Sequence, residues 1–152
     1  MSGPCVAPYG SWKSPITSER IVSGTVGLEQ VALDGDDIYW IESRPLEGGR
    51  YVIVRRTPDG QTRDITPPPY NVRTRVHEYG GGAYAARDGI VYFANFADQR
   101  LYRQDRDAAP QPITPAGPRR YADLDIGPQG DIVCVQEDHS AADHEPVNTM
   151  SG

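Results

Sequence analysis

The dipeptide His77-Glu78 is the first place in this sequence where acid–base or metal chemistry can be sought. Zinc peptidases carry the motif H-E-x-x-H, in which a second histidine completes the metal-binding pair. Gly81 takes the position of that second histidine here, so the dipeptide does not predict a zinc site. We interpret Arg75, His77 and Glu78 instead as a polar cluster that binds substrate or contacts another domain. The alternative, a structural ion pair at a turn, is the commoner role of clustered charges.

Three consecutive glycines, Gly80, Gly81 and Gly82, follow this cluster. A glycine costs about 0.5–1 kcal/mol relative to alanine inside a regular element, so glycines are kept where the backbone needs positive φ or a close approach. We therefore predict a structural turn that enters a crowded strand at residues 83–86. The glycines do not form a phosphate-binding loop, because no Gly-Lys-Ser or Gly-Lys-Thr follows and the single lysine, Lys13, is remote.

Acidic and histidine side chains gather again near the end of the sequence, at residues 137–139 (EDH) and 143–145 (DHE). His139 and His144 are five positions apart, which does not align them on one face of a helix. A loop between strands is therefore a better interpretation than a metal site, and we expect neither a metal nor a cofactor. No serine lies in the G-x-S-x-G turn that exposes a nucleophile, so no catalytic residue is assigned.

The composition of the 152-residue chain limits its partners. Its 21 acidic and 15 basic residues give a net charge of −6, which argues against nucleic acid or an anionic membrane as the main partner. No apolar stretch has the length of a membrane-spanning helix, and the first residues do not resemble a secretory signal. Cys5 and Cys134 match no metal spacing and are expected to be reduced thiols, so we predict a cytoplasmic protein.

The charges are unevenly distributed along the chain. Arginines concentrate between residues 50 and 75, and acidic residues concentrate between residues 123 and 145. Such runs usually form solvated surfaces, so we favour that interpretation of both over binding patches.

Short β-strand patterns separated by turns recur along the chain. Apolar strands that contain Ile38 and Ile90 are each followed by two further strands and by the same closing tripeptide, Ile-Thr-Pro. Four strands in roughly 40–50 residues is the period of a β-propeller blade. The predicted strands comprise residues 30–33, 37–43, 51–56 and 61–65, then 83–86, 90–95, 100–104 and 111–114, and finally 121–126 and 131–137.

These repeats predict an all-β fold, namely an incomplete β-propeller with two four-stranded blades and half of a third. We place the blades at about residues 28–69, 81–116 and 119–152, with the third truncated after its second strand. The partial propeller therefore comprises residues 28–152. Residues 1–27 are predicted to form an N-terminal arm, in which several prolines and a glycine argue against a helix.

Five segments of the chain are distinctive in sequence: Tyr9–Thr17 (YGSWKSPIT), Asp34–Pro45 (DGDDIYWIESRP), Val54–Gly60 (VRRTPDG), Val76–Tyr84 (VHEYGGGAY) and Glu145–Thr149 (EPVNT). In this order they resemble the N-terminal propeller of the prolyl oligopeptidase family. The most similar branch contains the bacterial acylaminoacyl-peptidase or dipeptidyl-aminopeptidase-like enzymes. The resemblance extends over nearly the whole chain.

The resemblance implies a propeller joined to a C-terminal α/β-hydrolase domain with a Ser-Asp-His triad, which cuts short peptides while the propeller excludes folded proteins. The sequence shows no such domain, so we expect a non-catalytic propeller part with a role in gating and substrate restriction. Its expected partners are the hydrolase domain and, through that domain, a peptide substrate. The paired glutamates with which the dipeptidyl branch holds a substrate amine have no match, because Glu78 stands alone.

A second interpretation is a stand-alone propeller-like binding module that completes its ring by oligomerisation. An incomplete propeller should expose apolar surface, which we expect from the strands at residues 38–41 and 90–93. Val133 and Val135 should lie on an unpaired strand edge, and such an edge is a template for association with another chain. Self-association through open blade edges is therefore expected.

Overall fold

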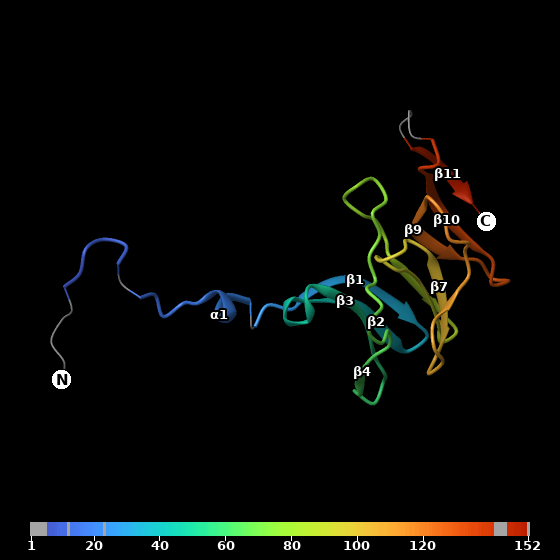
Figure 1. Cartoon of the computed structure of the whole chain (residues 1–152). Helices are drawn as coiled ribbons and strands as arrows, with labels where there is room; N and C mark the ends of the chain where they lie inside the picture. The colour runs from blue at the N-terminus through green and yellow to red at the C-terminus, as the bar shows by residue number, and fades with distance from the viewer. Residues whose placement is uncertain (1–5, 12, 23, 142–145, 152) are drawn as a thin grey trace.

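The computed structural model describes residues 6–11, 13–22, 24–141 and 146–151. Three antiparallel sheets, of four, four and three strands, follow one another along the chain and confirm the predicted all-β class. Figure 1 shows the first sheet in blue to green, the second in green to yellow and the third in orange to red. The strands are β1 (Gly27–Asp34), β2 (Asp37–Arg44), β3 (Arg50–Arg56) and β4 (Thr62–Asp64), then β5 (Tyr84–Arg87), β6 (Ile90–Ala94), β7 (Leu101–Asp105) and β8 (Gln111–Pro112), and finally β9 (Arg119–Ile126), β10 (Ile132–Asp138) and β11 (Val147–Ser151).

Tight Asp-Gly turns fix the register of the first hairpin in the first two sheets. Gly35 connects β1 to β2 with a φ of 59°, and Asp88 and Gly89 connect β5 to β6 with φ values of 53° and 76°. Two-residue hairpin turns favour positive φ because the resulting backbone twist matches that of the flanking strands. The Asp34 carboxylate also accepts hydrogen bonds from the backbone N–H groups of Asp88 and Gly89, at 2.8 and 2.7 Å, so the two turns are joined.

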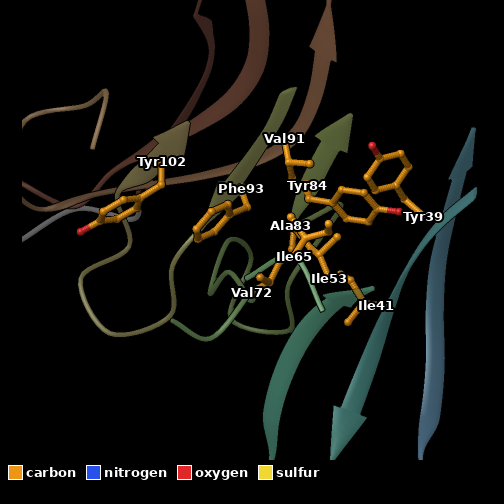
Figure 2. Packing of buried hydrophobic residues seen from close by; sticks show 10 residues of the cluster. All are labelled: Tyr39, Ile41, Ile53, Ile65, Val72, Ala83, Tyr84, Val91, Phe93 and Tyr102. Carbon is orange, nitrogen blue, oxygen red and sulfur yellow. The ribbon is translucent and has the colours of Figure 1, made fainter. Parts of the chain in front are cut away.

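Apolar side chains of the first and second sheets pack against each other and form the larger core (Figure 2). Burying one side chain of the size of isoleucine or phenylalanine contributes about 1.5–3 kcal/mol, so this cluster dominates the association of the two sheets. A smaller cluster formed by Ala94, Leu101, Tyr121 and Cys134 joins the second sheet to the third. The larger core consists of Tyr39, Ile41, Ile53, Ile65, Val72, Ala83, Tyr84, Val91, Phe93 and Tyr102.

Side-chain hydrogen bonds connect the first strands of the three sheets, β1, β5 and β9. Gln30 and Asp123 interrupt the regular pairing of β1 and β9, and both have positive φ, at 46° and 53°. The Gln30 amide accepts a hydrogen bond from the backbone N–H of Ala83 at 2.8 Å and donates one to the carbonyl of Tyr84 at 2.6 Å. Asp123 Oδ1 accepts one from the backbone N–H of Gly82 at 2.7 Å. The beginning of β5 is thus held from both sides.

The third sheet has three strands, so the prediction that the third blade ends after its second strand is wrong. Residues 147–151 form β11, which pairs with β10 along its length, so β10 is the central strand of three. Val135 lies opposite Ala122 on one side and Met150 on the other, and is therefore not at an unpaired edge. Val133 lies opposite Asp125 of β9, but the pairing of β10 with β11 begins at the next residue, Cys134, so among the described residues Val133 has a strand partner on one side only.

The exposed apolar surface also differs from the prediction. Tyr39 and Ile41 of β2 and Val91 and Phe93 of β6 are buried, because both strands lie inside their sheets and face the core between sheets. Apolar side chains are exposed instead on β1, the edge strand of the first sheet, where Leu28, Val31 and Leu33 are 68–71% exposed.

The N-terminal segment contains a short helix that the sequence analysis did not expect. Helix α1 (Ser18–Val22) lies on a segment that extends away from the sheets in Figure 1. Thr17 begins it, because its side-chain oxygen accepts a hydrogen bond from the backbone N–H of Arg20 at 3.2 Å. Pro15 precedes the helix and so does not break it. No described helix is long and apolar enough to cross a membrane.

Candidate functional site

Residues 72–76 lead into the predicted polar cluster and form an extended segment between the first two sheets. Val72, Thr74 and Val76 are buried, whereas Arg73 and Arg75 are exposed, so the side chains alternate as in a strand. The backbone N–H of Val72 donates to the carbonyl of Tyr51 in the first sheet at 2.9 Å, and that of Arg73 donates to the carbonyl of Ala94 in the second at 3.1 Å. The segment is therefore hydrogen-bonded to both sheets and connects them.

Residues 76–82, which we call the His-Glu turn, follow this segment. The backbone N–H of Glu78 donates to the carbonyl of Arg75 at 3.0 Å, and that of Gly80 donates to the carbonyl of Val76 at 2.8 Å. His77 and Glu78 have φ values of 55° and 65°. The left-handed region costs a residue with a side chain roughly 1–2 kcal/mol, so the turn needs support from its surroundings.

Glu137 of β10 supplies part of that support. Its side chain is 3% exposed, and its Oε1 accepts a hydrogen bond from the backbone N–H of His77 at 2.6 Å. Oε1 also lies 3.2 Å from His77 Nδ1, and Oε2 lies 2.9 Å from His139 Nε2. Burial alone raises the pKa of the Glu137 carboxyl, but the hydrogen bonds from His139 and the His77 backbone outweigh it, so the pKa is lowered.

Arg120 of β9 holds the other side of the turn. Its Nη1 donates to the carbonyl of Arg75 at 2.8 Å and to Oε1 of Glu78 at 2.6 Å. The same nitrogen lies 3.9 Å from Oε2 of Glu137. Two carboxylates and the turn backbone thus share one guanidinium, which fixes Glu78 although its side chain is 77% exposed. The third sheet therefore determines the conformation of the His-Glu turn.

The three glycines act in two different ways. Gly80 has a φ of 96°, which is the positive φ that the sequence predicts for this turn. A Cβ atom on Gly81 would lie 3.0 Å from Ala122 Cβ, and one on Gly82 would lie 2.9 Å from Asp123 Oδ1. Both distances are shorter than ordinary van der Waals contacts, so Gly81 and Gly82 allow the chain to approach β9 closely.

The structure brings together only part of the predicted cluster. His77 and Glu78 share the network of Arg120 and Glu137, whereas Arg75 contributes its carbonyl oxygen to that network. The Arg75 guanidinium lies elsewhere, 4.8 Å from the centroid of the Phe96 ring.

Sequence reasoning did not connect Arg120, Glu137 and His139 with the turn, because these residues lie about 40–60 positions further along the chain. Glu137 and His139 were noted only as possible metal ligands. In the described part of the chain, no group of three or more His, Cys, Asp or Glu side chains could hold a metal ion. Residues 143–145 and Cys5, which also entered the sequence-based predictions, lie outside the described residues.

The described residues around the turn do not assemble a nucleophile. Neither His77 nor His139 is hydrogen-bonded to a serine, threonine or cysteine side chain in the described ranges. The Cys134 thiol is buried at the second core, and burial raises its pKa, which makes it less reactive. Exposed at the turn are the Glu78 carboxylate and the Tyr79 ring.

Three consecutive antiparallel sheets, at residues 27–64, 84–112 and 119–151, pack against one another through two apolar clusters. This arrangement defines the class of β-propeller proteins. Comparison with solved structures then identifies the relatives. The chain matches the crystal structure of puromycin hydrolase at 34% identity and a TM-score of 0.84, over 95% of this chain and 24% of that one. The same values hold for a mutant of puromycin hydrolase complexed with PGG.

A puromycin-hydrolyzing peptidase of Mycobacterium tuberculosis is 38% identical, with a TM-score of 0.78, over 96% of this chain and 24% of that one. The predicted resemblance is confirmed: the chain is similar to an N-terminal part of puromycin hydrolase, a peptidase of the prolyl oligopeptidase family. It spans about a quarter of the length of these solved chains. No protein-family model and no curated protein sequence matches it.

Proposed function

We propose that this chain serves as part of the propeller of a serine peptidase that acts on short peptides, and that its role there is gating and substrate restriction. The observation that supports this proposal most is the match over 95% of the chain to a peptidase four times as long. The absence of a nucleophile elbow from the sequence agrees with a non-catalytic role. The expected partner is a C-terminal α/β-hydrolase domain, which would bind the peptide.

Arg75, His77 and Glu78 are proposed to form the rim that contacts substrate or the hydrolase domain. Glu78 and Tyr79 are exposed, yet Arg120 and Glu137 hold the turn that carries them in one conformation. A fixed and exposed polar turn is preorganised for binding, because little ordering entropy is lost when a ligand arrives. We also propose a cytoplasmic location, which is supported by the free, buried Cys134.

A chimaeric enzyme tests this function. In it, the matched quarter of puromycin hydrolase is replaced by residues 6–151 of this chain, and hydrolysis of a tripeptide is compared with that of a 30-residue peptide. We expect activity on the tripeptide and exclusion of the long peptide. A chimaera that cuts both peptides equally fast would show that this chain does not restrict the substrate. A second chimaera that carries Glu137→Leu serves as the matched control, since it should loosen the turn.

A stand-alone binding module that completes its ring by oligomerisation is the second candidate, and one observation favours it. Leu28, Val31 and Leu33 are exposed on β1, an edge strand that pairs with no described strand on one side. Light scattering distinguishes the candidates when combined with the chimaera: a defined ring of identical chains, together with an inactive chimaera, would support the binding module.

A further inference from the structure

Two arginines on the approach to the His-Glu turn lie over the same aromatic ring. The guanidinium carbon of Arg73 is 5.0 Å from the centroid of the Phe96 ring, and that of Arg75 is 4.8 Å from it. Arg73 also lies 5.4 Å from the centroid of the Tyr51 ring. Both arginines are exposed, although the chain as a whole carries a net charge of −6. We call Arg73, Arg75 and Phe96 the arginine platform.

The backbone fixes the spacing of the platform. Because Arg73 and Arg75 alternate with buried residues in an extended segment, their side chains leave it on the same side, roughly 7 Å apart. The backbone N–H of Arg75 donates to Oε1 of Gln99 at 2.8 Å, and that of Phe96 donates to the carbonyl of Asn71 at 2.8 Å. The segment and the loop that carries Phe96 are therefore joined, and the two guanidinium groups stay close together.

The guanidinium groups of the platform have no carboxylate partner among the described residues. They contact the aromatic rings, and Arg75 donates one long hydrogen bond, 3.4 Å, to the carbonyl of Phe96. Asp98 belongs to the same loop as Phe96, but its carboxylate already accepts hydrogen bonds from Asn95, Arg100 and Tyr102. Other exposed arginines, such as Arg103, form ion pairs. Two adjacent cations without a counter-ion repel each other, and an anion between them removes that repulsion.

A cavity of about 140 Å³ meets the platform at Arg73 and extends to the His-Glu turn, whereas Arg75 and Phe96 lie outside its lining. Arg73 and Thr74 line one part of it, Tyr79 and Gly80 line another, and Glu29 of β1 is the only acidic residue among its lining. No ion pair joins Glu29 to Arg73 within the described residues, so the Arg73 guanidinium is available as a hydrogen-bond donor at the edge of the cavity. It has room for the last residue of a peptide rather than for a folded segment.

From these contacts we propose that the arginine platform is a carboxylate-binding subsite, and that its ligand is the C-terminal carboxylate of a short peptide. Guanidinium groups recognise carboxylates through paired, charge-assisted hydrogen bonds, and the aromatic ring beneath them holds their planes in place. The inference rests on the proposed function, since it assigns an end of the substrate to this rim. Such a site would favour peptides whose C-terminal carboxylate can contact the platform while the rest of the peptide is bound for cleavage. It would therefore restrict the length of the substrate.

Equilibrium dialysis of this chain against labelled, N-acetylated tripeptides tests the proposal. The acid form should bind about three- to fivefold more tightly than the amide form, in line with exposed guanidinium–carboxylate pairs. Arg73→Met and Arg75→Met should each reduce that ratio, and the double variant should abolish it. Arg56→Met is the matched control, because Arg56 is exposed at the opposite end of β3 and has no ion pair among the described residues; it should leave the ratio unchanged.

Several outcomes would overturn the proposal. Equal binding of acid and amide, no binding of the acid at millimolar peptide, or an equal loss with Arg56→Met would each show that the platform is not the site. An amidated peptide with an internal glutamate that binds as well as the acid would exclude the C-terminus as the preferred source of the carboxylate. The dialysis needs no catalysis, so an inactive chimaera together with a preserved acid preference would refute only the peptidase role.

Discussion

Replacing Glu137 by leucine should destabilise the chain, because this buried carboxylate is the acceptor on which the His-Glu turn depends. The substitution leaves the backbone N–H of His77 without its acceptor at 2.6 Å, and it removes the partner of His139 at 2.9 Å. An orphaned buried donor costs about 1–3 kcal/mol, and breaking a buried charged network costs about 3–5 kcal/mol. Since Arg120 remains paired with Glu78, we expect a loss of about 2–4 kcal/mol.

The free energy of unfolding is measured by urea denaturation followed by circular dichroism. Asp138→Asn serves as the control, because Asp138 is the next residue of β10 and its ion pair with Arg119 is partly exposed on both sides. Such surface pairs contribute about 0–1 kcal/mol, so the control should lose less than 1 kcal/mol. A loss below about 0.5 kcal/mol for Glu137→Leu would refute the view that the third sheet supports the turn.

The same carboxylate predicts a dependence on pH. The pKa of Glu137 is lowered in the folded chain from its ordinary value of 4.5, because hydrogen bonds from His139 and the His77 backbone outweigh the opposing effect of burial. The ionised group therefore contributes stability that is complete above pH 4.5 and is lost as the pH falls through the folded value. Glu137→Gln keeps an acceptor oxygen but has no charge to lose. The stability difference between the wild type and this variant should shrink in acid, and a constant difference would contradict this account.

Three further predictions concern other parts of the chain. Gly81→Val should cost about 1–3 kcal/mol by overpacking against Ala122, whereas Gly117→Val, where a Cβ would meet nothing, should cost little in the same denaturation assay. The chain alone should hydrolyse no aminoacyl or acylaminoacyl chromogenic substrate, and stoichiometric labelling of a serine by a phosphonate probe would contradict its non-catalytic role. Val31→Lys should increase the monomer fraction in light scattering, since a charge on an exposed edge strand opposes association; an unchanged distribution would exclude β1 as the contact.

The sequence predicted the strands well where local chemistry determines them. The strand expected at residues 90–95 is β6 (Ile90–Ala94), because an apolar run bounded by an Asp-Gly turn has few alternatives. The strand at residues 147–151 was missed, because it is short and comes soon after an acidic stretch that favoured a loop. Its strand character comes from pairing with β10, which is a tertiary contact.

The candidate site could be predicted only in part, for a related reason. The glycines marked the turn, since a requirement for small residues is visible locally. The partners of the turn, Arg120 and Glu137, belong to the following sheet, and nothing in their spacing connects them to His77. The role of Arg75 differed as well, because the alternation of an extended segment directs its side chain to Phe96, away from Glu78. The spacing of the repeats predicts the strands of each sheet, but it does not predict which side chains of different sheets will be in contact.

The side chains of Gln30 and Asp123 make the two amides just before β5 sensitive to the separation of the sheets. The Gly82 N–H is bonded to Asp123 of the third sheet, and the Ala83 N–H is bonded to Gln30 of the first. Exchange of these amide hydrogens with solvent deuterium therefore requires a neighbouring sheet to move away, even if β5 and β6 stay paired. Gly82 exchange reports on one junction and Ala83 exchange on the other. The exchange rates of these two consecutive amides thus measure separately how often the second sheet opens from the third and from the first.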